Sequence, residues 1–586
     1  MLKNIRSYFE KYKKYQYPLE KFFFPVVLLL YPLIGVNSGV DIADTTYSLA
    51  NYQYMSDIDP MWILSTFFSN IVGKLFMNLP FGGTMLGINI YCSLLISLVA
   101  LISYYMLQEY MPGWMIFIGL FISESLFWCP REILYNVLTY AFLTIAMLFL
   151  LKGMFTWSGQ GKYLFLAGVF LGVNVMVRFP NIVEAALILV LWFYCLITRE
   201  EFLESLKKTG ICIGGYATGF GVLYLISCVM YGPLAYFKMI GDLFGMTSGA
   251  SDYSSGGMIS MILEGYTSTL TKMVIIIPCM LAGMVMFAIK SDKYVWIKKG
   301  LYIVGLFILV RYFFAEGTFT RNYHYYDSIF DAAMMFIIIA VILGVIGSTG
   351  FLNGNKQEQT LAFATVMLIL ILPVGSNNYT YPILNCLFVI APITLWLMRR
   401  LMQRLGEKEV NFPWQAMITM VIIALLIQGG IFHYVFAFGD GMDGTKRDSS
   451  STRILKISGM VSSKNNIDSL EELAIVMDQR ADNEEKAIFF GGVPGLSYIF
   501  DIEPAINTTW PDLDSYSIEK YEKALTDLSV SDDPKPMIII GKQMQEYANI
   551  SAKYNILLDY ISEHDYNKVF ESERFIVFAN SSENEE

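Results

Sequence analysis

FFFPVVLLLYPLIGVNSGVDIADTTYSL, residues 22–49, places a long apolar run directly before two aspartates, Asp41 and Asp44. Crossing the hydrocarbon core of a bilayer takes about 20 apolar residues, and fewer where neighbouring helices thin the bilayer. The run has basic residues on its N-terminal side, but no small-residue cleavage site follows it. We therefore interpret it as a retained membrane anchor and not as a signal peptide.

The composition of the whole chain is that of a protein with many membrane spans. Of its 586 residues 55% are hydrophobic and only 16% are charged, and the mean hydropathy is +0.49. These values lie outside the range of soluble domains. The acidic net charge belongs to the C-terminal part alone, because residues 440–586 hold 14 Lys and Arg against 28 Asp and Glu.

Apolar runs of spanning length recur along the first three quarters of the chain and predict thirteen transmembrane helices. They lie near residues 22–37, 84–107, 112–128, 133–151, 163–177, 182–198, 210–231, 273–289, 300–315, 329–347, 360–374, 382–398 and 414–436.

The distribution of basic residues supports this count. With thirteen spans, the cytoplasmic side holds 20 Lys and Arg, and the loops and helix ends of the opposite side before residue 440 hold seven, which agrees with the positive-inside rule. Counting residues 61–79 as a further span would invert the pattern, so we expect an amphipathic helix lying in the outer interface there. The N-terminus is then cytoplasmic and the acidic C-terminal part extracytoplasmic.

The C-terminal part has the pattern of a soluble α/β domain. Short apolar runs at 487–492, 537–541 and 575–579 predict strands, and helical-period stretches lie between them. We expect an all-α polytopic membrane domain over residues 1–437 and an extracytoplasmic α/β domain over residues 438–586. The long segment 232–271 between two spans is rich in Gly and Ser and predicts a mobile lid.

Ionisable side chains gather at the predicted outer ends of the spans. The candidates for substrate binding are Arg131, Glu132, Arg178, Glu184, Arg311, Arg321 and His324. Each of them alone is explained by a long side chain that reaches the interface. Together they predict an anion site, because charges at membrane depth are costly and tend to mark function. A lipid phosphate is the anion most available there, and Arg binds phosphate through charge-assisted hydrogen bonds.

At this point the chain resembles the GT-C superfamily of integral-membrane glycosyltransferases. The resemblance rests on many spans, a D-x-x-Y motif (Asp44 to Tyr47) in the first outer loop, an interfacial helix after it and a soluble outer C-terminal domain. It implies a polyprenyl-phosphate sugar donor and a glycan, lipid or protein acceptor on the outer face. It also implies Asp44 as the general base, with Asp41 as a second polar contact or as the alternative base. A helix cap is the competing explanation for Asp44, because Asp is a favoured N-cap residue.

The chemistry that fits is direct displacement with inversion. A carboxylate takes the proton of the acceptor hydroxyl, and the lipid phosphate leaves without a general acid. No cofactor is certain; a divalent cation at the two carboxylates stays open, although D-x-x-D without a nearby His is a weak metal signal. A transporter or flippase of lipid-linked glycans is the main alternative, and a non-catalytic assembly protein is a further one. Besides the bilayer we expect no nucleic-acid partner.

Overall fold

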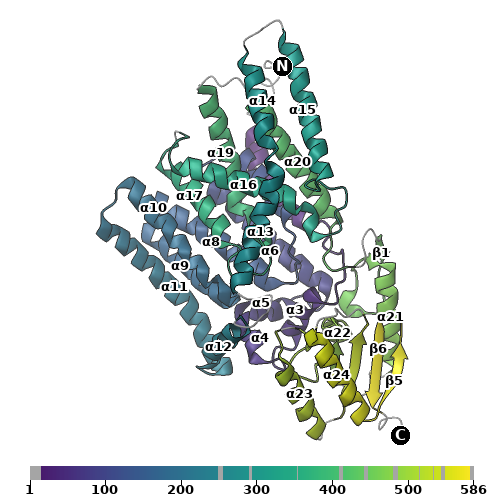
Figure 1. Cartoon of the computed structure of the whole chain (residues 1–586). Coiled ribbons are helices and arrows are strands. Elements are labelled where there is room, and N and C mark those ends of the chain that lie inside the picture. The colour runs from purple at the N-terminus through teal and green to yellow at the C-terminus, as the bar shows by residue number, and fades with distance from the viewer. Residues whose placement is uncertain are drawn as a thin grey trace.

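The computed structural model describes residues 15–247, 255–289, 294–352, 354–407, 413–440, 446–479, 486–513, 515–531, 534–542 and 548–580. A bundle of helices makes up most of the molecule, and a domain with a β-sheet lies at one end of it (Figure 1). The bundle helices are α2 (Phe24–Leu30), α6 (Met85–Leu107), α7 (Gly113–Leu126), α8 (Leu134–Phe155), α9 (Gln160–Val177), α10 (Ile188–Thr198), α11 (Phe202–Tyr231), α13 (Ser255–Met273), α14 (Ile276–Ala288), α15 (Val295–Ala315), α16 (Phe330–Ser348), α17 (Lys356–Ile371), α19 (Leu387–Glu407) and α20 (Trp414–Val435).

Short helical turns extend several of these helices. They are the π-helical turn η1 (Leu19–Phe23), the 3-10 turns η2 (Tyr31–Leu33), η3 (Phe179–Leu187) and η5 (Tyr326–Ile329), and the single turn α18 (Tyr381–Leu384). Each of the thirteen predicted spans falls on a helix or on such a run of helical turns. Within the described ranges, eight helical segments are long and apolar enough to cross a membrane, which identifies a multi-pass membrane protein. The other predicted spans are shorter or interrupted helices, such as the 14-residue α7.

The segment between α2 and α6 forms a small helical layer between the helix bundle and the sheet domain (Figure 1). It contains α3 (Asp44–Gln53), α4 (Pro60–Ser65) and α5 (Phe67–Met77). The single interfacial helix expected over 61–79 is divided at Thr66, whose backbone is not helical. Asn70 bridges the break, because its side-chain amide donates to the carbonyl of Ile63 and to Oγ1 of Thr66, at 3.0 and 3.1 Å.

The expectation of a loop over 232–271 is wrong for the described part of that segment. Residues 235–247 form α12 (Ala235–Thr247), and the helix α13 starts at Ser255. The apolar spacing within these stretches outweighs their glycines and serines, and both helices pack against other elements, α12 on α4 and α13 on α16. The part of the predicted lid at 248–254 lies outside the described residues.

The C-terminal domain is a four-stranded mixed sheet with helices on both faces. The strands are β3 (Ala487–Phe490), β4 (Met537–Gly541), β5 (Tyr566–Glu571) and β6 (Phe575–Asn580). Their order is β3-β4-β6-β5, with β3 parallel to β4 and the other pairs antiparallel. The helices are α21 (Lys464–Asp478), α22 (Leu496–Phe500), α23 (Ile518–Val530) and α24 (Ala548–Glu563), and a small pair, β1 (Arg447–Ser449) and β2 (Ser462–Ser463), precedes them. Every residue of β3 and β4 is buried, as expected for strands covered on both faces.

One face of this sheet shares its hydrophobic core with the segment that carries the two aspartates. Phe489 and Ile539 of the sheet belong to the same buried cluster as Val40, Ile42 and Leu49. The other sheet face packs against α23 and α24 in a separate cluster. The domain is therefore built onto α3 and the loop before it.

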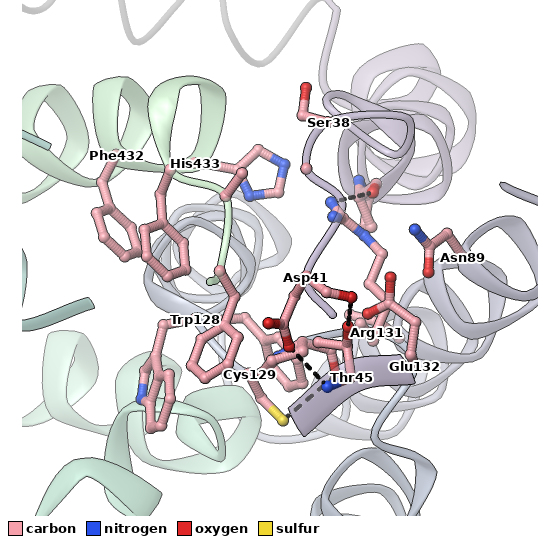
Figure 2. A pocket seen from close by; sticks show the side chains of 18 of the residues that line it. Ser38, Asp41, Thr45, Asn89, Trp128, Cys129, Arg131, Glu132, Phe432 and His433 are labelled. Atoms are coloured by element: carbon pink, nitrogen blue, oxygen red, sulfur yellow. Dashed lines mark hydrogen bonds between the residues drawn. The ribbon is translucent and has the colours of Figure 1, made fainter. Parts of the chain in front are cut away.

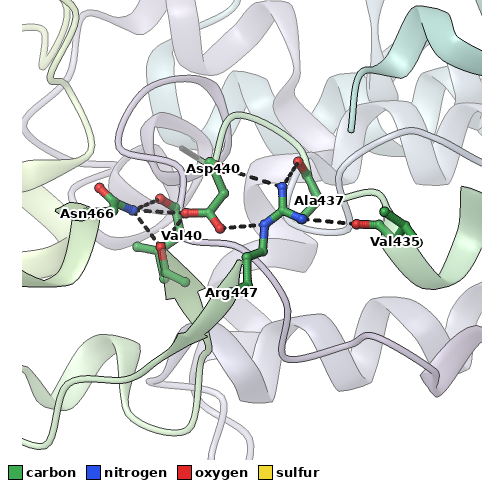
Figure 3. A network of polar contacts seen from close by, with 7 residues as sticks. Val40, Val435, Ala437, Asp440, Arg447 and Asn466 are labelled. Atoms are coloured by element: carbon green, nitrogen blue, oxygen red, sulfur yellow. Dashed lines mark hydrogen bonds and ion pairs between the residues drawn. The ribbon is translucent and has the colours of Figure 1, made fainter. Parts of the chain in front are cut away.

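A polar network adds to this attachment (Figure 3). The carboxylate of Asp440 accepts from Nε of Arg447 at 2.8 Å and from Nδ2 of Asn466 at 3.0 Å. Asn466 Nδ2 also donates to the carbonyl of Val40 at 2.8 Å, and Arg447 donates to the carbonyl of Val435 at 3.0 Å. The network thus connects the end of α20, the start of the sheet domain and the chain just before Asp41.

Candidate active site

The two aspartates of the opening stretch have different roles in the backbone. The helix α3 begins at Asp44, and the side chain of Asp41 accepts hydrogen bonds from the backbone N–H of Ala43 at 3.0 Å and of Thr45 at 2.8 Å. Asp41 is 5% exposed. The capping carboxylate is therefore Asp41, which satisfies free donors at the helix N-terminus. The cap explanation considered for Asp44 does not apply to it.

Asp44 instead faces a cavity of about 440 Å³. Asp44 is an exposed residue, and its carboxylate has no hydrogen bond or ion pair with any residue that the structure describes. The surrounding protein removes part of its hydration, which raises the pKa of Asp44 above its usual value. A carboxylate with a raised pKa and no competing partner is suited to accept a proton.

The cavity has three kinds of wall. Charged and aromatic groups come from Asp44, Tyr47, Tyr135 and Arg178. Uncharged polar side chains come from α3, α4, α5 and the sheet domain, namely Ser48, Asn51, Ser65, Thr66, Asn70 and Ser515. Apolar side chains come from η3, α12 and α13, namely Phe179, Ile182, Val183, Leu243, Phe244 and Met258. A ligand with charged, polar and apolar parts would match this division.

Two contacts fix the position of the Arg178 side chain. It follows α9, and its Nη2 donates to the carbonyl of Gly375 at 3.2 Å. Its guanidinium also lies over the ring of Tyr135, at 5.8 Å from the ring centre. Gly375 approaches Pro180 so closely that a Cβ there would meet the Pro180 Cβ at 2.8 Å. Within the described chain Arg178 forms no ion pair with Asp44, so both charges remain available to a ligand between them.

The sheet domain completes the cavity. Trp510 of the domain lies edge-on to Tyr47, with ring centres 5.3 Å apart, and both residues line the cavity. The backbone N–H of Gly495 donates to the carbonyl of Ile42 at 3.0 Å, just before α3. At the other end of α3, Lys456 of the domain donates to the side chain of Gln53 at 2.9 Å. The domain therefore fixes both ends of the helix that carries Asp44.

Arg131 and Glu132 line a different cavity, of about 60 Å³, together with Asp41 (Figure 2). The Arg131 guanidinium donates to the carbonyls of Pro32 and Ile34, each at 3.2 Å. Burial, reinforced by the negative charge of Asp44, raises the pKa of Asp41 to about 7. The small volume leaves room for a few water molecules and not for a sugar lipid.

The remaining predicted residues lie apart from the two cavities. Glu184 is buried on η3 and accepts from Nδ2 of Asn174 at 2.7 Å. Arg311 is exposed near the end of α15, Arg321 lies 5.7 Å from the ring centre of Phe314, and His324 is in the loop before η5. Of the ten candidates, the structure brings Asp44, Tyr47 and Arg178 together in the large cavity.

Several lining residues were not predicted from the sequence. Asn51 has a signal in the sequence, because Asp44, Tyr47, Ser48 and Asn51 follow the spacing of one helix face. Trp510 and Tyr135 have none, because they reach the cavity only through the packing of distant segments. Within the described ranges, no group of three or more His, Cys, Asp and Glu residues has the arrangement of metal ligands.

Comparisons with known proteins give a loose structural likeness. No family model and no curated protein matches the chain. Solved structures of the Archaeoglobus fulgidus oligosaccharyltransferase overlay on it at 12% identity. The apo form has a TM-score of 0.47 and covers 96% of this chain and 75% of that one. The complex with Zn and sulfate has a TM-score of 0.49 and covers 95% of this chain and 73% of that one. The form tethered with an acceptor peptide that contains the NVT sequon has a TM-score of 0.47 and covers 96% of this chain and 74% of that one.

Proposed function

We propose that the protein is a GT-C type membrane glycosyltransferase. It takes a sugar from a polyprenyl-phosphate donor and transfers it, with inversion, to a glycan, lipid or protein acceptor on the outer face of the membrane. The observation that carries this proposal is the shared cavity of about 440 Å³, where the unpaired carboxylate of Asp44 and the anchored guanidinium of Arg178 meet polar and apolar walls.

The walls suggest how a donor lies. Arg178 binds the phosphate, since a guanidinium presents several N–H donors in a fixed plane. The apolar side chains of η3, α12 and α13 contact the first units of the polyprenyl chain. The sugar then lies towards α3, where the polar side chains and Asp44 are.

In the reaction, Asp44 accepts the proton of the acceptor hydroxyl as its oxygen forms a bond to the anomeric carbon. The bond between that carbon and the phosphate oxygen breaks, and its electron pair stays on the phosphate. Arg178 stabilises the charge that develops there. Attack opposite to the leaving group inverts the anomeric centre. Asp41 acts as a positioning residue, because its side chain caps the helix on which Asp44 stands.

The proposal places the N-terminus in the cytoplasm and the sheet domain outside. The excess of basic residues in the loops assigned to the cytoplasm supports this orientation. A single cysteine introduced at Ser450, in a background without the native cysteines, should react with a membrane-impermeant thiol reagent in intact cells. Reaction only after lysis would reverse the orientation.

The function is tested with purified protein and a panel of polyprenyl-phosphate-linked sugars, each offered with extracts of cell-envelope lipids, glycans and proteins. Turnover should release free polyprenyl phosphate and label an acceptor. Release that is the same without protein, or no release from any donor, would contradict the proposal. Movement of the intact lipid-linked sugar across a vesicle membrane without release would favour the transporter alternative.

A further inference from the structure

Asn51 is a buried polar residue whose side chain has no hydrogen-bond partner among the residues that the structure describes. It is 8% exposed and lines the large cavity. Its side-chain Oδ1 has no hydrogen-bond partner, and its amide nitrogen makes no hydrogen bond with another described residue. Buried side-chain amides in folded proteins are nearly always hydrogen-bonded. An unpartnered amide at a cavity wall therefore indicates a ligand that supplies the missing bonds.

The position of Asn51 relates it to the proposed chemistry. It lies seven residues after Asp44 on α3, which places both side chains on the same helix face about 10 Å apart along the axis. Tyr47 and Ser48 lie between them on this face. A ligand that reaches from Asp44 along α3 thus arrives at Asn51.

The cavity that Asn51 lines has several uncharged polar side chains besides it. Ser48 donates to the carbonyl of Asp44 at 3.3 Å and Ser65 donates to the carbonyl of Trp62 at 2.8 Å, so both hydroxyl oxygens keep acceptor capacity. Together with Thr66, Asn70 and Ser515 they form the polar wall of the cavity. A wall with amides and hydroxyls and no charge suits groups that both donate and accept hydrogen bonds, as sugar hydroxyls do.

We propose that Asn51 binds hydroxyl groups of a sugar ring, two helical turns from Asp44. The proposal rests on the proposed function, which it deepens by assigning a sugar-recognition residue to the same cavity. The side-chain Oδ1 has almost no accessible surface, so the amide nitrogen makes the contact, and its two N–H groups can donate to two neighbouring hydroxyl oxygens. The ring belongs either to the transferred sugar or to the acceptor.

The binding experiment uses the whole purified protein in detergent. The probes are four neutral sugars (glucose, galactose, mannose and N-acetylglucosamine), detected by saturation-transfer NMR, and undecaprenyl phosphate without a sugar. The variants are Asn51→Leu, which keeps the approximate shape without hydrogen bonds, and Asn51→Ala. Asn78→Leu is the matched control, because Asn78 is an exposed asparagine at the end of α5 that lines neither cavity.

We expect at least one sugar to bind the unmodified protein and the Asn78→Leu control equally. Both Asn51 variants should weaken that binding about tenfold or more, since two hydrogen bonds are lost. Undecaprenyl phosphate should bind all variants alike. The melting temperature of ligand-free Asn51→Leu should equal or exceed that of the unmodified protein, because a buried amide without a partner is removed.

The source of the ring is distinguished by turnover. A rise in the KM for the donor assigns Asn51 to the transferred sugar, and a rise in the KM for the acceptor assigns it to the acceptor. Unchanged sugar binding in the Asn51 variants, or no sugar binding to the unmodified protein, would overturn the proposal. A lower melting temperature with equal loss of both probes would instead assign Asn51 a structural role. None of these binding results depends on turnover, so they leave the proposed function intact.

Discussion

The contact between the sheet domain and α3 is tested by Gly495→Ala. The backbone of Gly495 has φ −74°, so alanine fits its conformation. A Cβ at this position would lie 1.6 Å from Oγ1 and 2.3 Å from Cβ of Thr46, and 2.8 Å from the carbonyl oxygen of Ile42. Rotating the Thr46 side chain does not relieve the contact with its Cβ. Since real Cβ atoms keep about 3.0 Å from other heavy atoms, the domain and α3 have to separate by at least about 0.7 Å to relieve the 2.3 Å contact.

The separation has two consequences. Overpacking costs about 1–3 kcal/mol, and losing the hydrogen bond from Gly495 to Ile42 costs about 0.5–1.5 kcal/mol. The first turn of α3, with Asp44, moves with Thr46, and a shift of about 1 Å near reacting groups can lower a rate about 10²-fold. We therefore expect a folded, less stable protein with a much lower transfer rate. Binding of undecaprenyl phosphate should be unchanged, because Arg178 is held by Gly375 and Tyr135.

The assay compares transfer rate, lipid binding and melting temperature in Gly495→Ala and Gly492→Ala. Gly492 is in the same turn, and a Cβ there meets no atom within 4 Å, although its φ of +72° is unfavourable for alanine. This control has backbone strain of about 1–2 kcal/mol without the clash. If Gly495→Ala keeps the normal rate, or if both variants lose it equally, the domain does not position Asp44.

Three further predictions concern charges. Arg178→Met should weaken binding of undecaprenyl phosphate about 10- to 150-fold, the worth of a charged hydrogen bond, and unchanged binding would remove Arg178 from the phosphate site. Folding raises the pKa of Asp41 from 3.8 to about 7, so the folded protein favours the protonated side chain. The stability that this protonation contributes is present below about pH 4 and is lost as the pH rises to about 7. The melting temperature should fall over that window, Asp41→Asn should flatten the fall, and an equal fall in the variant would refute it. Arg447→Met leaves the buried carboxylate of Asp440 unpaired and should destabilise the sheet domain by about 3–5 kcal/mol, whereas adding Asp440→Asn should recover part of the loss; no recovery would show that the pair does not act as a unit.

The helical architecture could be predicted from the sequence because long apolar runs are a strong signal. The runs at 84–107 and 133–151, for example, coincide closely with α6 and α8. The signal is weaker where polar contacts interrupt a helix. Thr66 ends α4 through its backbone conformation and the hydrogen bonds of Asn70, which apolar spacing does not report.

Only part of the candidate site could be predicted, because the contacts between distant segments leave no pattern in the sequence. The D-x-x-Y motif located Asp44 and Tyr47, but the division of roles between the aspartates depends on where α3 starts, one residue earlier than the cap explanation assumed. The charge pattern selected Arg178 together with Arg131, although the two arginines line different cavities. The two arginines are separated because the loops after α7 and α9 take different paths, and no pattern in the sequence indicates those paths.

The central claim, that Asp44 is the base, is tested most directly by the transfer rate of Asp44→Asn beside its melting temperature and its binding of undecaprenyl phosphate. Asparagine keeps the size of the side chain and removes the proton acceptor. We expect normal folding and normal lipid binding with a rate lowered about 10²-fold or more. The remaining pH dependence should lose its acid limb, which in the unmodified protein is expected above the usual Asp range. A variant that transfers sugar at the normal rate would contradict the account.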